Sequence, residues 1–223
     1  MASRNEAKQQ KEKTSQALIE SALELCAEEG YASLSLRSVA RKAGIAPTSF
    51  YRHFREIDEM GVAMVEQAKE ALDGWLAGAR KKMTFPGVKA GDSPEKMLAA
   101  IELLTRPFVA TFTDCFNANP RLFHLFFQES SGCAPLLRSA ITDASDGLIR
   151  NLAGILKRSG KAFPGNIDEA NMIAETMITI VSRNVMENSS PPNFQLNYPT
   201  EPTIQKLNLL LLGALILKQT KQE

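Results

Sequence analysis

The sequence predicts an all-α protein of about nine helices, with a small N-terminal three-helix domain and a larger C-terminal helical domain. Apolar residues recur three or four positions apart in most segments between glycines and prolines, as expected for amphipathic helices. We find no convincing alternation of period two, which would indicate strands. The composition, 44% hydrophobic and 23% charged, is ordinary for a soluble globular protein.

The first predicted helix covers residues 11–29. Thr14 or Ser15 is a suitable N-cap, and Gly30 suits the position that follows a helix end. Residues 1–10 are predicted to precede this helix as a loose basic arm.

The next two helices have the spacing of a helix-turn-helix. Ser33 or Ser35 caps the second helix, Gly44 ends it, and Pro47 suits the first position of a short third helix. The buried side of this segment is predicted to consist of Ile45, Phe50 and Phe54.

The remaining helices follow from the same periodicity and from the glycines and prolines between them. We expect them at 58–82, 95–117, 120–130, 135–159, 168–188 and 204–220, with a long irregular crossing at 189–202 that contains four prolines. The predicted domains are the arm 1–10, a helix-turn-helix domain 11–71 and a second domain 72–223.

Positive charge is concentrated near the helix-turn-helix, although the net charge of the chain is only +1. Residues 35–55 contain five basic residues and no acid, giving +5, and residues 4–13 contain four basic residues and two acids, giving +2. A local basic face on a nearly neutral protein favours specific binding of nucleic acid.

Several other classes of protein are disfavoured. Two histidines and no Ser/His/Asp set, glycine-rich phosphate loop or Cys/His cluster argue against an enzyme, a metal site and a cofactor. The three cysteines are expected to be buried reduced thiols. No apolar run is long enough to span a membrane and the N-terminus lacks a signal-peptide pattern, so we expect a cytoplasmic protein.

The helix-turn-helix residues carry a family resemblance. The segments from Tyr31 to Arg37 and from Gly44 to Arg55 resemble the DNA-binding domain of TetR-type transcriptional regulators, and most of all the FabR-type repressors of unsaturated fatty-acid synthesis. A weaker likeness to their effector domain covers Leu125 to Gly132.

A recognition helix needs short side chains that reach base edges and basic or hydroxyl groups that hold phosphates. Thr48 and Ser49 suit the bases, and Arg52 suits either guanine or phosphate. The resemblance implies that Tyr51 and His53 bind phosphates. The full set of predicted DNA-binding residues is Lys11, Lys13, Arg37, Pro47, Thr48, Ser49, Tyr51, Arg52 and His53.

Aromatic residues at helical spacing in the second domain have two interpretations: they form an ordinary core, or some of them line a cavity for a long acyl chain. The candidate ligand-binding residues are Phe108, Phe112, Phe116, Phe126, Phe127 and Met177. The resemblance implies a long-chain acyl-CoA or acyl-carrier-protein thioester as effector. Arg106 or Arg183 is a candidate for its headgroup, with plain surface exposure as the alternative.

The last helix has a wide apolar face that either pairs two subunits or closes the core of its own subunit. Its members are Leu207, Leu210, Leu211, Ala214 and Leu217. A homodimer implies a palindromic operator. The sequence thus predicts a repressor of fatty-acid biosynthesis genes gated by acyl thioesters, in which the effector shifts the fourth helix. The alternative is a repressor of an efflux or stress operon gated by another hydrophobic molecule, with Glu102, Glu129 or Glu175 facing a cationic ligand.

Overall fold

The computed structural model describes residues 2–85, 87–88, 91–158, 166–189 and 199–220, and these are all helical or irregular, with no strand among them. The all-α prediction is confirmed. The α-helices are α1 (Ala2–Glu29), α2 (Leu36–Lys42), α3 (Pro47–Phe50), α4 (Ile57–Lys82), α5 (Pro94–Ala118), α6 (Pro120–Gln128), α7 (Pro135–Arg158), α8 (Ile167–Asn188) and α9 (Glu201–Thr220), with 3-10 turns η1 (Tyr31–Ser33) and η2 (Glu129–Ser131).

Most helix ends lie within three residues of their predicted positions, but α1 begins at Ala2 instead of residue 11. The prediction of Thr14 or Ser15 as its cap was therefore wrong, and the Thr14 hydroxyl instead donates to the carbonyl of Gln10 within the helix. Residues 5–13 contain no large apolar side chain, so hydrophobic periodicity gave no sign that they are helical.

The chain packs as two compact units, each assembled from separate parts of the sequence. Among the described residues, unit 1 contains 2–68 and 120–143, and unit 2 contains 69–119, 144–189 and 199–220. Both α4 and α7 contribute to each unit. The division into functional domains at residue 71 remains a prediction, because these packing units are not continuous in the sequence.

In unit 1, α1 packs against α2 and α6, and Tyr31 joins the chain that follows α1 to the start of α4. The Tyr31 hydroxyl donates to the carbonyl of Ile57 at 3.3 Å and lies 3.5 Å from an oxygen of Asp58. It fits there because Gly61 has no side chain: a Cβ at this position would overlap the hydroxyl and lie 3.3 Å from Leu137. Gly61 therefore allows a close approach that another residue would prevent.

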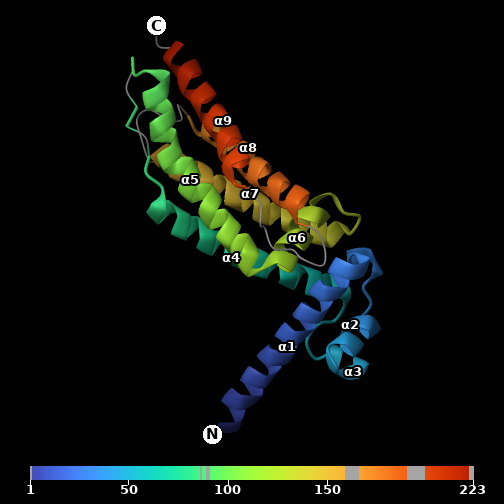
Figure 1. Ribbon diagram of the computed structural model, residues 1–223. Helices are drawn as coiled ribbons and strands as arrows, with labels where there is room; N and C mark the ends of the chain where they lie inside the picture. Colours follow the sequence, from blue (N-terminus) through green and yellow to red (C-terminus); the bar gives the residue numbers. More distant parts are fainter. Residues whose placement is uncertain (1, 86, 89–90, 159–165, 190–198, 221–223) are drawn as a thin grey trace. The chain divides into compact units, whose positions relative to one another are not determined.

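In unit 2, α9 packs against α5 and α8, and the three helices lie side by side (Figure 1). Trp75 of α4 is buried against α5, with its ring 5.2 Å from Phe108 and 5.0 Å from Phe112, both edge to face. Its indole N–H donates to the Thr111 hydroxyl at 3.1 Å. The single tryptophan of the chain thus belongs to the core of unit 2.

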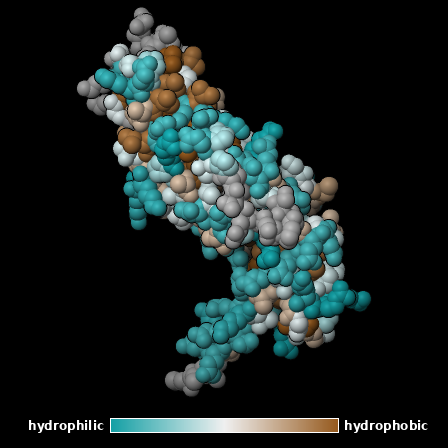
Figure 2. All heavy atoms as spheres, in the orientation of Figure 1, coloured by the Kyte–Doolittle hydropathy of each residue, from teal (hydrophilic) through white to brown (hydrophobic). Residues whose placement is uncertain are grey.

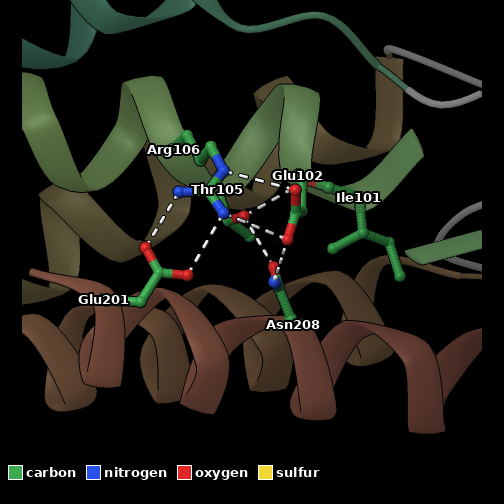
Figure 3. A network of polar contacts seen from close by, with 6 residues as sticks. All are labelled: Ile101, Glu102, Thr105, Arg106, Glu201 and Asn208. Carbon is green, nitrogen blue, oxygen red and sulfur yellow. Dashed lines mark hydrogen bonds and ion pairs between the residues drawn. The ribbon is translucent and has the colours of Figure 1, made fainter. Parts of the chain in front are cut away.

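A polar network crosses the contact between α5 and α9 (Figure 3). The buried Thr105 hydroxyl donates to the side-chain carbonyl of Asn208 at 2.7 Å, and the Asn208 amide donates to Glu102 at 3.4 Å. Toward the surface, Arg106 binds both Glu102 and Glu201. Because each buried polar group has a partner, the network fixes how α9 sits along α5.

The described residues contain no helix long and apolar enough to span a membrane. Most of the predicted proline-rich crossing, 190–198, lies outside them. The expectation of buried thiols is met by Cys26, whose pKa is raised to about 12 by burial and by Glu129, whereas Cys115 is half-buried and Cys133 is exposed.

We expect Gly61→Ala to lower the free energy of unfolding by about 1–3 kcal/mol, because the added methyl group must displace Tyr31. Gly74→Ala is the matched control: it lies on the same helix, and its Cβ would meet no atom within 4 Å. This control should stabilise the protein by about 0.5–1 kcal/mol through the better helix propensity of alanine. Chemical denaturation followed by circular dichroism measures both, and equal stability of the two variants would contradict the close approach.

Candidate DNA-binding surface

Helix α2, the first helix of the helix-turn-helix, is fixed by hydrogen bonds at both ends. At its start, Ser35 and Ser38 form a capping box: each side-chain oxygen accepts from the backbone N–H of the other at 3.1 Å. At its end, Gly44 has φ +69°, the left-handed region that glycine tolerates best. The N–H of Gly44 donates to Arg41 and that of Ile45 to Ala40, which is the pattern of a Schellman motif. The turn between α2 and α3 is therefore determined by local chemistry.

The third helix is a single turn whose buried side holds it in place. Pro47 occupies its first turn, where a missing N–H removes no helical hydrogen bond. Phe50 and Phe54 are buried with ring centres 5.8 Å apart, and Ile45 is half-buried. Tyr51 to His53 continue as hydrogen-bonded turns after α3 ends at Phe50.

Burial of the two phenylalanines leaves the predicted DNA-binding side chains on the outside. Pro47, Thr48 and Arg52 are exposed, and Tyr51 is 60% exposed although it is aromatic. Ser49 and His53 are half-buried. Between α2 and the start of α3 the surface is hollowed by about 660 Å³, and the hollow is lined by Ser35, Arg37, Ser38, Arg41, Ile45 and Pro47.

The basic residues of this segment differ in whether acids neutralise them. Lys42 lies 3.4 Å from Glu24 and 3.5 Å from Glu28 of α1, and its pKa is raised by these carboxylates, foremost by the hydrogen bond that Lys42 donates to Glu24. In the described part of the chain no carboxylate pairs with Arg37 or Arg41. These two arginines are one helical turn apart and both line the hollow. Arg41 was missing from the predicted site, although its i, i+4 spacing from Arg37 was a usable signal.

His53 lies close to a basic residue of α1. Burial lowers its pKa, and the positive charges of Lys11 and Arg52 lower it further, which favours the neutral ring. Its Nδ1 is buried without a hydrogen-bond partner. Lys11 is exposed on α1, as is Lys13, but two residues correspond to about 200° around a helix. Lys11 and Lys13 therefore lie on opposite sides of α1.

The residues predicted to bind a ligand are divided between the two units. Phe108, Phe112, Phe116 and Met177 are buried in unit 2, whereas the buried Phe126 and the half-buried Phe127 belong to unit 1. Both arginines proposed to bind the headgroup of the effector already form ion pairs with carboxylates. Arg106 pairs with Glu102 and Glu201, and Arg183 lies 2.7 Å from Glu187, both at the surface.

Unit 2 contains a groove beside Trp75 that the sequence did not reveal. Its volume is about 230 Å³, it opens to the surface, and it is lined by Trp75, Gly78, Ala79, Lys82, Thr111, Asp114 and Cys115. The small residues Gly78 and Ala79 of α4 leave room for the groove. Small residues do not contribute to an apolar period, so helical periodicity gave no sign of it.

The predicted dimer residues lie on different sides of α9. Leu207 and Leu211 are buried within the single chain, which agrees with the alternative that they close the core of their own subunit. Leu210 and Ala214 are half-buried, and Leu217 is 65% exposed. Large apolar side chains that the sequence analysis did not select are also exposed, among them Leu209 at 71% on α9 and Met172 at 62% on α8.

Comparison with known proteins identifies the N-terminal segment. Residues 18–64 match the sequence model of the family "Bacterial regulatory proteins, tetR family", which includes the whole of α2 and α3.

Solved structures share the fold of most of the chain at low identity. A fatty acid degradation regulator FadR from Bacillus halodurans has 19% identity and a TM-score of 0.61, over 90% of this chain and 95% of its own. The transcriptional regulator FadR from Bacillus subtilis, in complex with stearoyl-CoA, has 20% identity and a TM-score of 0.60, over 89% and 98%. A multidrug binding protein EbrR complexed with imidazole has 18% identity and a TM-score of 0.57, over 88% and 94%. The N-terminal segment that contains α2 and α3 thus matches the tetR family model, and most of the chain shares its all-helical fold with solved transcriptional regulators.

Proposed function

We propose that this chain is a repressor that binds a palindromic operator as a homodimer, and that a long-chain acyl thioester controls this binding. The observation that carries the DNA-binding half is the group of unpaired arginines around the hollow beside α3. The effector half is supported by the resemblance to FabR-type repressors, and by the fold shared with a regulator solved with stearoyl-CoA.

In this proposal some of the predicted DNA-binding residues contact bases and the others contact phosphates. Thr48 and Ser49 are short enough to meet base edges or a thymine methyl group in the major groove. Arg37 and Arg41 bind backbone phosphates of one DNA strand, because a guanidinium offers parallel N–H donors that match the phosphate oxygens. Tyr51 and His53 hold phosphates, while Arg52 reaches guanine or phosphate. His53 does so as a neutral donor, since its buried Nδ1 has no partner for a second proton.

The dimer is proposed to form through the outward sides of α8 and α9. Met172, Leu209 and Leu217 are the most exposed large apolar side chains of these two helices. Figure 2 shows apolar atoms gathered on the surface over the C-terminal end of α9. Exposed apolar patches of this kind are typical of interaction sites, and a two-fold dimer would bury each of them twice.

The effector is proposed to enter unit 2 through the groove beside Trp75. The ring of Trp75 separates this groove from Phe108 and Phe112, so an acyl chain that displaces the indole reaches the apolar interior. Met177 is completely buried in unit 2, and a methionine repacks easily around chains of different shape. Since α4 runs from unit 1 into unit 2, a change at Gly78 is transmitted along the same helix whose start is bound by Tyr31.

The alternative, a regulator of an efflux or stress operon, is favoured by the fold shared with the multidrug binding protein. A pocket for an aromatic cation requires an unpaired acid near apolar side chains. In unit 2, Glu102 is paired with Arg106, and Glu175 is exposed, whereas Glu129 of unit 1 is half-buried and burial raises its pKa. The two acids of unit 2 therefore argue for an uncharged acyl chain over a cationic ligand in that unit.

The proposed role of the arginines is tested by comparing Arg41 with the adjacent Lys42. Arg41→Gln should weaken binding to a duplex selected from a random library by about tenfold, and reduce the slope of log K against log salt by about one per protomer. Lys42→Gln removes the same charge one residue away, but this lysine is already paired with Glu24 and Glu28, so the slope should hardly change. Equal salt slopes in the two variants would show that pairing does not decide which charges meet DNA.

The effector proposal predicts that stearoyl-CoA and oleoyl-CoA change the affinity for the selected duplex in opposite directions and alter the fluorescence of Trp75. Gly78→Leu fills the groove and should abolish both responses, whereas Gly74→Leu places the same side chain four residues away on α4, outside the groove lining. Gel shift and fluorescence titration measure them, with free coenzyme A as control. If neither acyl-CoA has an effect on the unmodified protein, the lipid effector is excluded.

The dimer proposal predicts that Leu209→Asp raises the dimer dissociation constant by about 100-fold or more, because association would bury two unpaired carboxylates. Leu136→Asp changes a leucine of similar exposure on α7 of unit 1 and should leave the dimer intact. Light scattering after size-exclusion chromatography gives the mass of each. A dimer that survives Leu209→Asp would place the interface elsewhere.

A further inference from the structure

Helix α5 contains a proline in its interior, and a separate segment of unit 2 binds the backbone group that this proline leaves without a helical partner. Pro107 has no N–H, so it cannot donate to the carbonyl of Leu103, four residues earlier in the helix. The backbone N–H of Thr84, just after the end of α4, donates to this carbonyl instead, at 3.1 Å. One backbone hydrogen bond thus fills the gap in α5 and joins the helix to the end of α4.

On the C-terminal side of Pro107, hydrogen bonds connect the proline to the groove beside Trp75. The Trp75 indole N–H donates to the Thr111 hydroxyl at 3.1 Å, and this hydroxyl donates to the carbonyl of Pro107 at 2.7 Å. Such a bond from a threonine to the carbonyl four residues earlier often bends a helix. Thr111 also lines the groove, together with Asp114 and Cys115 of the same helix. The part of α5 beyond Pro107 therefore forms one wall of the groove.

On the N-terminal side of Pro107, α5 is tied to α9 (Figure 3). The Thr105 hydroxyl donates to Asn208, and Arg106 pairs with Glu201 at 2.9 Å. Separating buried polar partners costs more free energy than moving them together, so we expect this part of α5 and α9 to move as one body. Pro107 lies at the boundary between this body and the groove wall.

The bond from Thr84 is the weaker of the two kinds of restraint on the N-terminal part of α5. An interior proline interrupts the helical hydrogen bonds and is a usual site of bending. Thr84 and Leu103 are both exposed, so water can replace the bond between them at little cost. Thr105 and Asn208 are buried, so their bond is expensive to break. Bending at Pro107 would therefore release Thr84 before it separates α5 from α9.

We propose that Pro107 is a hinge of α5 and that Thr84 is its latch. When an acyl chain occupies the groove, the hydrogen bond from Thr84 to Leu103 opens, and residues 94–106 turn about Pro107 together with α9. The inference rests on the proposed acyl effector and states how its binding is converted into a movement within unit 2.

The position of Trp75 explains how the groove acts on the hinge. Its ring centre lies 5.2 Å from that of Phe108, the residue that directly follows Pro107. An acyl chain that displaces the indole therefore changes the packing of α5 next to the hinge and removes the hydrogen bond from Trp75 to Thr111. Both changes act on the same turn of α5.

The test compares Pro107→Ala with Pro94→Ala in the full chain. Alanine at position 107 supplies an N–H that can donate to Leu103 within the helix, which removes the hinge and turns this carbonyl away from Thr84. Pro94 is the matched control, because it occupies the first turn of the same helix, where a missing N–H removes no helical hydrogen bond. Circular dichroism and thermal unfolding verify that both variants fold.

Hydrogen exchange of the Thr84 amide, resolved by NMR, measures the latch, and fluorescence of the single tryptophan measures binding of stearoyl-CoA. In the unmodified protein without effector, this amide should exchange about tenfold more slowly than in an unfolded peptide of the same sequence. Saturating stearoyl-CoA should remove the protection, and Pro94→Ala should behave alike. In Pro107→Ala, the amide should be unprotected throughout, and stearoyl-CoA should bind without changing the affinity for the selected duplex.

The inference is overturned if the Thr84 amide is unprotected in the unmodified protein, or if it stays protected when stearoyl-CoA is bound. It is also overturned if Pro107→Ala keeps the protection. If the fluorescence shows that stearoyl-CoA does not bind, the proposed effector is refuted, and exchange without effector still decides on the latch. Protection that is lost in Pro107→Ala and kept in Pro94→Ala would then support it.

Discussion

The geometry of the turn at Gly44 is the constraint on which the DNA-binding surface depends. Its positive φ and the two hydrogen bonds of the Schellman motif set the direction in which the chain leaves α2. Burial of Phe50 and Phe54 then fixes the rotation of the single turn of α3 about its axis. Local contacts therefore suffice to place Arg41 of α2 and Thr48 of α3 where both can bind the same partner. A short helix with little intrinsic stability can act as the proposed recognition element because its neighbours hold it in place.

Pairing, more than the number of charges, shapes the electrostatics of this surface. The five basic residues of 35–55 would form one undivided patch if all were free. Glu24 and Glu28 of α1 neutralise Lys42, which leaves the arginines of this segment, Arg37 and Arg41 around the hollow among them, as the charges available to phosphates. Glu24 also lies 3.8 Å from Arg121 of α6, so the same carboxylate links three helices of unit 1. A chain with a net charge of +1 can in this way present a local positive field where it is needed.

Local signals in the sequence were sufficient for the fold, and they failed where contacts across the fold decide the outcome. Caps, glycines and helical periodicity predicted most helix ends and the helix-turn-helix, because each depends on neighbours within about four residues. They did not show that Lys42 is paired, since its partners lie 14 and 18 residues away. They also did not show which apolar side of α9 faces inward, because its leucines surround the helix. The helical start of α1 escaped prediction because it has no apolar residue to reveal a period.

The network between α5 and α9 explains how an event inside unit 2 would affect its outer surface. Breaking the bond between Thr105 and Asn208 leaves the buried side-chain oxygen of Asn208 without its donor, at a cost of about 1–3 kcal/mol. A second buried hydrogen bond, which the Asn184 amide donates to the Thr203 hydroxyl, joins α8 to α9. Displacement of α5 by a bound molecule therefore costs less free energy if α9 moves with α5 than if the hydrogen bonds between the helices break. Because α9 also carries the exposed Leu209 and Leu217, a change in the interior of unit 2 moves the surface proposed to meet a second subunit. An effector that distinguishes two positions of α5 would in this way distinguish two arrangements of a dimer, which is the differential binding that allostery requires.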